Sequence, residues 1–117
     1  MHELSIVLSI VEIAETQTKT VKASRVDRID LEIGELAGVA FDALDFAWEL
    51  GVKNSVLQGA ERHIHHIEGK ARCMDCGHIF PIHQLFDACP SCGQFLLDIV
   101  QGKELRVKSL EVSGAER

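Results

Sequence analysis

The cysteines of this 117-residue chain are the feature that most restricts what it can fold into. All four occur in two CxxC pairs, which twelve residues separate. The pairs consist of Cys73, Cys76, Cys89 and Cys92. A glycine follows each pair and can adopt the positive φ angle that such a tight turn needs. Two turns that each supply two thiolates fit one tetrahedral zinc ion, with zinc–sulfur bonds of about 2.3 Å.

Disulfide bonds and a redox-active CxxC are the competing interpretations of these cysteines. Met1 is followed by charged and apolar residues without a basic region or a cleavage site, so we expect no secretory leader and a cytoplasmic protein with reduced thiols. A thioredoxin-type redox site uses one motif beside a βαβ unit, whereas two matched pairs indicate a metal. Because sulfur fills all four positions, we predict a structural zinc that binds no catalytic water.

Composition restricts the size of the fold and the kind of partner. A chain of 117 residues can build one compact domain, or a small domain with a metal-stabilised insert. The formal net charge of −6 disfavours a nucleic-acid partner, which requires a basic surface. No apolar run approaches the roughly 20 residues that span a bilayer. We therefore predict neither a nucleic-acid partner nor a membrane segment.

The spacing of apolar residues predicts an α/β fold. Helical spacing predicts two helices, over residues 3–19 and 42–51, with Gly51 as a C-terminal stop and Trp48 in the core. Alternation over residues 25–34 predicts a half-buried strand. Two further strands are expected, over residues 60–67 and 105–112.

These elements predict a small mixed three-stranded sheet with two helices, plus an inserted zinc-ribbon module. The C-terminal strand completes the sheet, so the insert leaves and rejoins it at neighbouring points. We expect residues 1–69 with 101–117 to form an α/β domain, and residues 70–100 to form a zinc-binding domain.

The first three residues, Met1, His2 and Glu3, can form a second metal site. The terminal amine, the His2 backbone nitrogen and the His2 imidazole can close adjacent chelate rings around one ion, and the Glu3 amide nitrogen comes next. Four nitrogens in a plane suit Ni(II) or Cu(II). The first N–H groups of a helix have no intrahelical acceptor, although its dipole opposes a cation there. The alternative is that His2 is a surface residue and Glu3 an ordinary helix-start carboxylate.

Four motifs occur together in a fixed order: Met1-His2-Glu3, the EIGEL segment at 32–36, the two cysteine pairs and VKSLEV at 107–112. This combination resembles the HypA/HybF family of hydrogenase nickel-incorporation proteins over nearly the whole chain. The resemblance implies a nickel metallochaperone that is not an enzyme. The resemblance also implies that His2 binds Ni(II), with Met1 and Glu3 as neighbours, and that the four cysteines bind structural zinc. A HypB-type GTPase and the hydrogenase large subunit are the implied partners, with the urease machinery as a further one.

The remaining histidines allow two interpretations. His63, His65 and His66 could form an accessory nickel site or a polar strand face, and only the first two share a face. His78 could exchange with a zinc-bound sulfur when thiolates are protonated, giving a pH-sensitive site. We expect both His78 and His83 to be solvated loop residues.

Two other functions remain open at the level of sequence. The cysteine pattern alone also fits a zinc-ribbon module that binds protein or nucleic acid, although the acidic balance and few aromatic residues disfavour base stacking. A zinc hydrolase would need an open coordination position. We find neither a GxxxxGK[ST] phosphate loop nor a GxSxG elbow, so nucleotide hydrolysis is assigned to a partner. A monomer and a homodimer are both compatible with the sequence.

Overall fold

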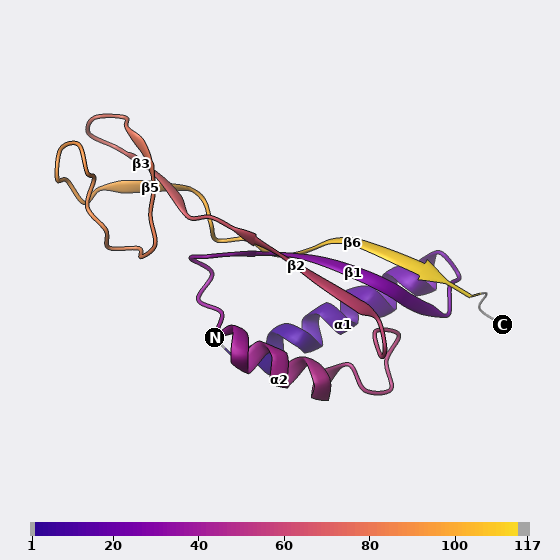
Figure 1. Cartoon of the computed structure of the whole chain (residues 1–117). Coiled ribbons are helices and arrows are strands. Elements are labelled where there is room, and N and C mark those ends of the chain that lie inside the picture. The colour runs from indigo at the N-terminus through magenta and orange to yellow at the C-terminus, as the bar shows by residue number, and fades with distance from the viewer. Residues whose placement is uncertain (1, 115–117) are drawn as a thin grey trace. The chain divides into compact units, whose positions relative to one another are not determined.

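A computed structural model describes residues 2–114, which form two helices and six strands (Figure 1). The helices are α1 (Glu3–Thr20) and α2 (Phe41–Gly51). The strands are β1 (Arg25–Gly34), β2 (Glu61–Ile67), β3 (Lys70–Cys73), β4 (Ile79–Pro81), β5 (Leu97–Gln101) and β6 (Leu105–Ser113). They form two three-stranded sheets, with the orders β2-β1-β6 and β4-β3-β5. The predicted fold of two helices, a three-stranded sheet and a cysteine-bearing insert is confirmed.

The chain packs into two compact units. Of the described residues, the first unit contains 2–31, Val39–Ile64 and 106–114. The second unit contains Glu32–Gly38 and His65–Leu105, and therefore all four cysteines. The assignment of nickel binding and zinc binding to separate domains stays a prediction.

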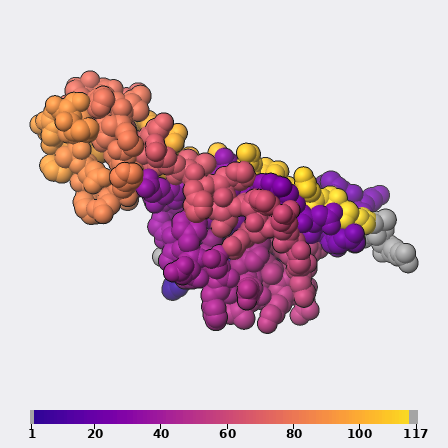
Figure 2. All heavy atoms as spheres, in the orientation of Figure 1, coloured from indigo at the N-terminus to yellow at the C-terminus, as the bar shows by residue number. Residues whose placement is uncertain are grey.

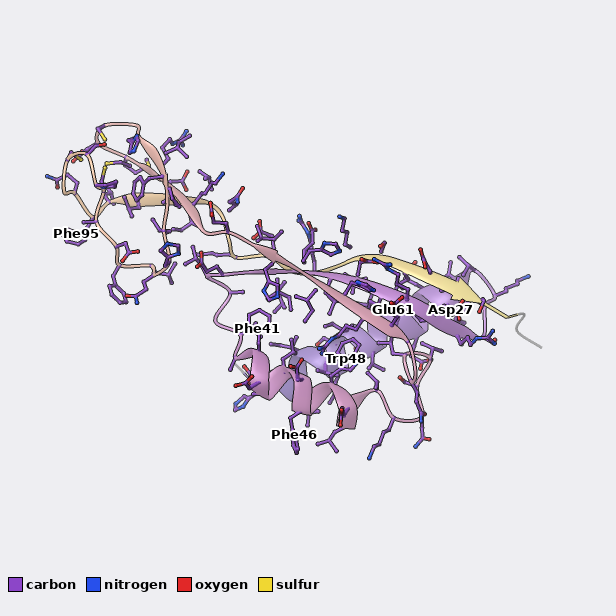
Figure 3. The ribbon with its side chains drawn as sticks, in the orientation of Figure 1. Asp27, Phe41, Phe46, Trp48, Glu61 and Phe95 are labelled. Atoms are coloured by element: carbon purple, nitrogen blue, oxygen red, sulfur yellow. The ribbon has the colours of Figure 1, made fainter. Side chains whose placement is uncertain are left out.

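The core of the first unit lies between the two helices and the sheet, whose same face both helices cover (Figure 1). Trp48 of α2 is only 8% exposed, as predicted, and Figure 3 shows Phe46 on the other side of the helix, where it is 72% exposed. The guanidinium of Arg62 in β2 lies 5.2 Å from the Trp48 ring centroid, a cation–π contact. The most deeply buried side chains of this unit are Val7, Ala14, Ile29, Leu44 and Leu57.

Helix α2 ends at Gly51, where the sequence predicted a C-terminal stop, and Val52 is the residue that caps the helix. A Cβ atom at position 51 would lie 2.5 Å from Val7 Cγ1, so the glycine allows α1 and α2 to approach closely. Neither of these described helices is long and apolar enough to cross a membrane.

Apolar and charged residues alternate along β1, which places the charged side chains on the side of the sheet away from the core. Arg28 donates two hydrogen bonds to the Asp30 carboxylate, each of 3.0 Å. This hydrogen bond raises the pKa of Arg28, and the charges of Asp30, Glu111 and Glu61 add to the effect. The Ser109 hydroxyl lies 3.3 Å from Asp30, so β6 presents a polar residue to the same side. The half-buried strand predicted over residues 25–34 is therefore confirmed.

The small sheet of the second unit is antiparallel on both sides of β3. Arg72 is opposite Ile79 of β4 and Asp98 of β5, and its guanidinium lies 3.2 Å from the Asp98 carboxylate. The atoms of this region form one compact body in Figure 2. The buried cluster around this sheet consists of Ala71, Cys73, Phe80, Ile82 and Cys89, and Leu36, Leu97 and Ile99 pack against it.

Candidate metal centres

The two cysteine pairs lie in turns of the same construction. In the first turn the Cys73 N–H donates to the His78 carbonyl, and the Gly77 N–H donates back to the Cys73 carbonyl, both at 2.9 Å. The second turn repeats both bonds from Cys89 at 2.8 Å. The glycines after the pairs have φ angles of 76° and 75°, a conformation that only glycine adopts without strain. The sequence therefore forms two equivalent turns that each direct two sulfurs to one point.

The four sulfurs have the spacing of a tetrahedral metal site. The Sγ atoms of Cys73 and Cys92 are 3.5 Å apart, those of Cys76 and Cys89 are 3.7 Å apart, and all four lie within 4.8 Å of one another. Zinc–sulfur bonds of about 2.3 Å in a tetrahedron place sulfurs about 3.8 Å apart. Cys73 and Cys89 are buried, whereas Cys76 and Cys92 are exposed. The four side chains fit one ion held by thiolates alone.

The thiols influence one another's ionisation strongly. Burial raises the pKa of Cys89, but N–H groups of Cys92 and Ser91 and the neighbouring thiols outweigh it and bring that pKa to about 7. For Cys92, the Gln94 N–H lowers the pKa, yet hydrogen bonds with Cys73 and other thiols, together with burial, raise it to about 12. One of the four thiols thus loses its proton easily, while its neighbours hold theirs more tightly. A cation among the sulfurs makes four thiolates compatible at neutral pH.

The start of α1 leaves a histidine accessible. His2 is the N-cap residue, is exposed and makes no side-chain capping hydrogen bond. The Ile6 N–H donates a helical hydrogen bond to the His2 carbonyl, at 3.2 Å. The Glu3 carboxylate accepts a hydrogen bond from the Ala40 N–H at 3.3 Å, immediately before α2. Met1 lies outside the described residues. The imidazole predicted to bind nickel is therefore open to solvent.

The other histidines make separate contacts. His63 Nε2 lies 3.1 Å from Glu61, and the His78 ring stacks on Phe80 with centroids 5.7 Å apart. His83 Nδ1 lies 2.8 Å from Glu35, a pair that the sequence did not indicate. Within residues 2–114 the cysteines alone form a group of three or more side chains close enough to share a metal.

The fold and its sites together define a small α/β protein with a four-thiolate metal module and an exposed histidine at the start of its first helix. Comparisons with known proteins identify the family. Residues 1–112 match the family described as hydrogenase/urease nickel incorporation, metallochaperone, HypA. The chain belongs to the HypA family.

Relatives and solved structures agree with this assignment. The chain is 49% identical over 112 residues to the hydrogenase maturation factor HypA of Parabacteroides distasonis, covering 96% of this chain and 97% of the relative. It is 45% identical to the HypA of Geobacter metallireducens, over 96% of this chain and 99% of the relative. Among solved structures, the solution structure of the Ni metallochaperone HypA from Helicobacter pylori has a TM-score of 0.71 at 29% identity. That match covers 97% of this chain and 99% of the other.

Proposed function

We propose that this chain binds Ni(II) at its N-terminus and delivers it during maturation of [NiFe]-hydrogenase, while its four cysteines hold a structural zinc ion. The observation that supports this most directly is the separation of two donor types. An exposed imidazole stands at the start of α1, and a cluster of four sulfurs is folded around one point in the other unit. Nitrogen donors in a plane suit Ni(II), and tetrahedral thiolates suit zinc.

The proposed nickel ligands are the Met1 amine, the His2 backbone and imidazole nitrogens, and Glu3 as a neighbour. Because α1 begins at Glu3, the Glu3 amide nitrogen has no acceptor within the helix and can lose its proton without breaking a helical hydrogen bond. The Glu3 carboxylate also accepts a bond from Ala40, which orients it at the start of α1. The positive end of the helix dipole opposes the cation and keeps binding reversible, as delivery requires.

The proposed zinc is structural, because sulfur occupies all four positions and leaves none for water or substrate. The protein is then not an enzyme: it transfers a metal cargo and makes or breaks no substrate bond. A HypB-type GTPase would supply nucleotide hydrolysis, since the sequence contains no phosphate-binding loop of the GxxxxGK[ST] type. The hydrogenase large subunit would receive the nickel, and the urease machinery is a further acceptor that the family description names.

Replacement His2→Ala should weaken Ni(II) binding at least tenfold, because it removes a ligand, and loss of outer-shell partners alone costs about 10–100-fold in metal affinity. Adding one residue ahead of Met1 should have a similar effect, since it removes the terminal amine from the chelate. Isothermal titration calorimetry with Ni(II) on the zinc-loaded chain measures both. Zinc content and the amide spectrum should stay unchanged.

His66→Ala is the matched control, because His66 is also exposed but lies in β2. It should bind nickel as the wild type does. Unchanged nickel affinity in both N-terminal variants would remove His2 from the mechanism.

Delivery is tested separately by mixing nickel-loaded protein with the nickel-free hydrogenase large subunit and the GTPase, with and without His2. Equal nickel transfer by both forms would refute the proposed delivery route.

A further inference from the structure

The segment of residues 34–38 that follows β1 is attached to the chain on both sides of the four-cysteine module. The Glu35 N–H donates to the Ile67 carbonyl at 2.8 Å, at the end of the strand that leads into the module. The Leu36 N–H donates to the Gly102 carbonyl at 2.7 Å, where the chain leaves it. The segment therefore bridges the point of entry and the point of exit.

The Leu36 side chain continues this attachment into the core of the module. It packs against the buried cluster that includes two zinc ligands, Cys73 and Cys89. Glycines make room for it: a Cβ atom at Gly69 would lie 3.0 Å from Leu36 Cγ, and one at Gly102 would lie 3.1 Å from Leu36 Cδ1. The position of Leu36 thus depends on the cysteine turns being folded.

The Glu35 carboxylate provides a second attachment through both of its oxygens. Oε1 accepts a hydrogen bond from the Gly69 N–H at 3.0 Å, and Oε2 lies 2.8 Å from His83 Nδ1. The Gly69 carbonyl in turn accepts the Ile82 N–H at 2.8 Å. One carboxylate therefore connects the segment to the start of the module and to the loop after β4.

This attachment carries opposite charges in a defined pH range. The Gly69 N–H and then His83 lower the pKa of Glu35. The hydrogen bond with Glu35 and its charge raise the pKa of His83, and Asp87 and Glu68 add to the effect. Protonated His83 stabilises the folded state fully below the pKa that His83 has in the unfolded chain. This stabilisation is lost as the pH rises through the higher pKa of His83 in the folded state. The stabilisation that ionised Glu35 gives the folded state is lost as the pH falls through the lowered pKa of Glu35.

We propose that Glu35 and His83 form a pH-sensitive clasp that holds residues 34–38 onto the four-cysteine module. The clasp is closed while both partners are charged, and it weakens when His83 loses its proton. Four residues after Leu36 the chain reaches Ala40, whose N–H binds the Glu3 carboxylate. Weakening the clasp therefore loosens the segment that leads directly to the start of α2, while the Glu35 and Leu36 N–H bonds remain. The clasp requires neither a metal cargo nor a partner protein.

The test uses the full, zinc-loaded chain and two NMR measurements. The His83 imidazole should titrate above its ordinary pKa of about 6.5, and E35Q should bring it back toward that value. The second measurement is the hydrogen-exchange protection factor of the Gly69 and Leu36 amides. Protection factors correct for the intrinsic effect of pH on exchange and report how firmly these amides are held. As His83 deprotonates, both protection factors should fall about two- to fivefold, the range for an exposed ion pair.

H83Q should remove this pH dependence, because glutamine can still donate a hydrogen bond to Glu35 but does not titrate. H66Q is the control, since it removes an exposed histidine elsewhere in the same unit and should leave the pH dependence intact. The proposal is overturned if the fall in protection persists in H83Q, or if the pKa of His83 is the same in E35Q as in the wild type. Amides of the first unit show whether either variant has lost its fold.

Discussion

Removing the proposed zinc ion with a chelator should unfold residues 70–100 and leave the helices and sheet of the first unit folded. The buried cluster around β3 is small, and two of its five members, Cys73 and Cys89, are proposed zinc ligands. Segments below about 40 residues rarely fold without a metal or disulfides. Structural zinc contributes about 10 kcal/mol or more at neutral pH, so its loss exceeds what this core can supply.

Hydrogen exchange followed by mass spectrometry measures this result in each unit separately. Cys89→Ser should reproduce the effect of the chelator, because it removes a buried ligand. Ser91→Ala lies in the same turn, keeps all four thiolates and should behave as the wild type. Equal loss of protection in both units would show that zinc supports the whole chain rather than its own module.

The sequence predicted those parts of the fold in which one local pattern decides the structure. Helical spacing predicted residues 3–19, and α1 spans Glu3–Thr20. The alternation of Ile29, Leu31 and Ile33 with charged residues predicted β1. The cysteine spacing predicted a four-sulfur cluster, and the sulfurs do converge. In each case periodicity or a short loop places the side chains, so no knowledge of distant residues is needed.

Contacts between distant segments could not be predicted in this way. Gly51 was predicted to end the second helix, and α2 does end there, but its close approach to Val7, 44 positions earlier in the chain, was not predicted. His83 was expected to be a solvated loop residue, and it is 69% exposed, yet it pairs with Glu35. The EIGEL segment marked a family resemblance without indicating a contact. Only the folded structure brings that segment beside the cysteine module.

Replacement Gly34→Ala should release residues 34–38 from the cysteine module. A Cβ atom at position 34 would overlap the carbonyl group of Gly102, which is backbone and cannot rotate away. The same glycine donates its N–H to the Glu104 carbonyl at 2.7 Å, so the two chain segments cannot separate without losing that bond. Overpacking of this kind costs about 3 kcal/mol, which corresponds to roughly a hundredfold loss of exchange protection at the Leu36 amide.

Gly59→Ala is the matched control for backbone strain. Gly59 has a φ angle of 80°, and a Cβ atom at this position would have no neighbour within 4 Å, so alanine there meets strain without a clash. Gly59→Ala should lower the free energy of unfolding by about 1 kcal/mol. It should leave the Leu36 amide protected, because Gly59 belongs to the first unit. If Gly34→Ala cost no more than Gly59→Ala, the close approach of Gly34 to Gly102 would not be what holds the segment. If it does cost more, the close approach of Gly34 to Gly102 holds residues 34–38 to the module in addition to the clasp.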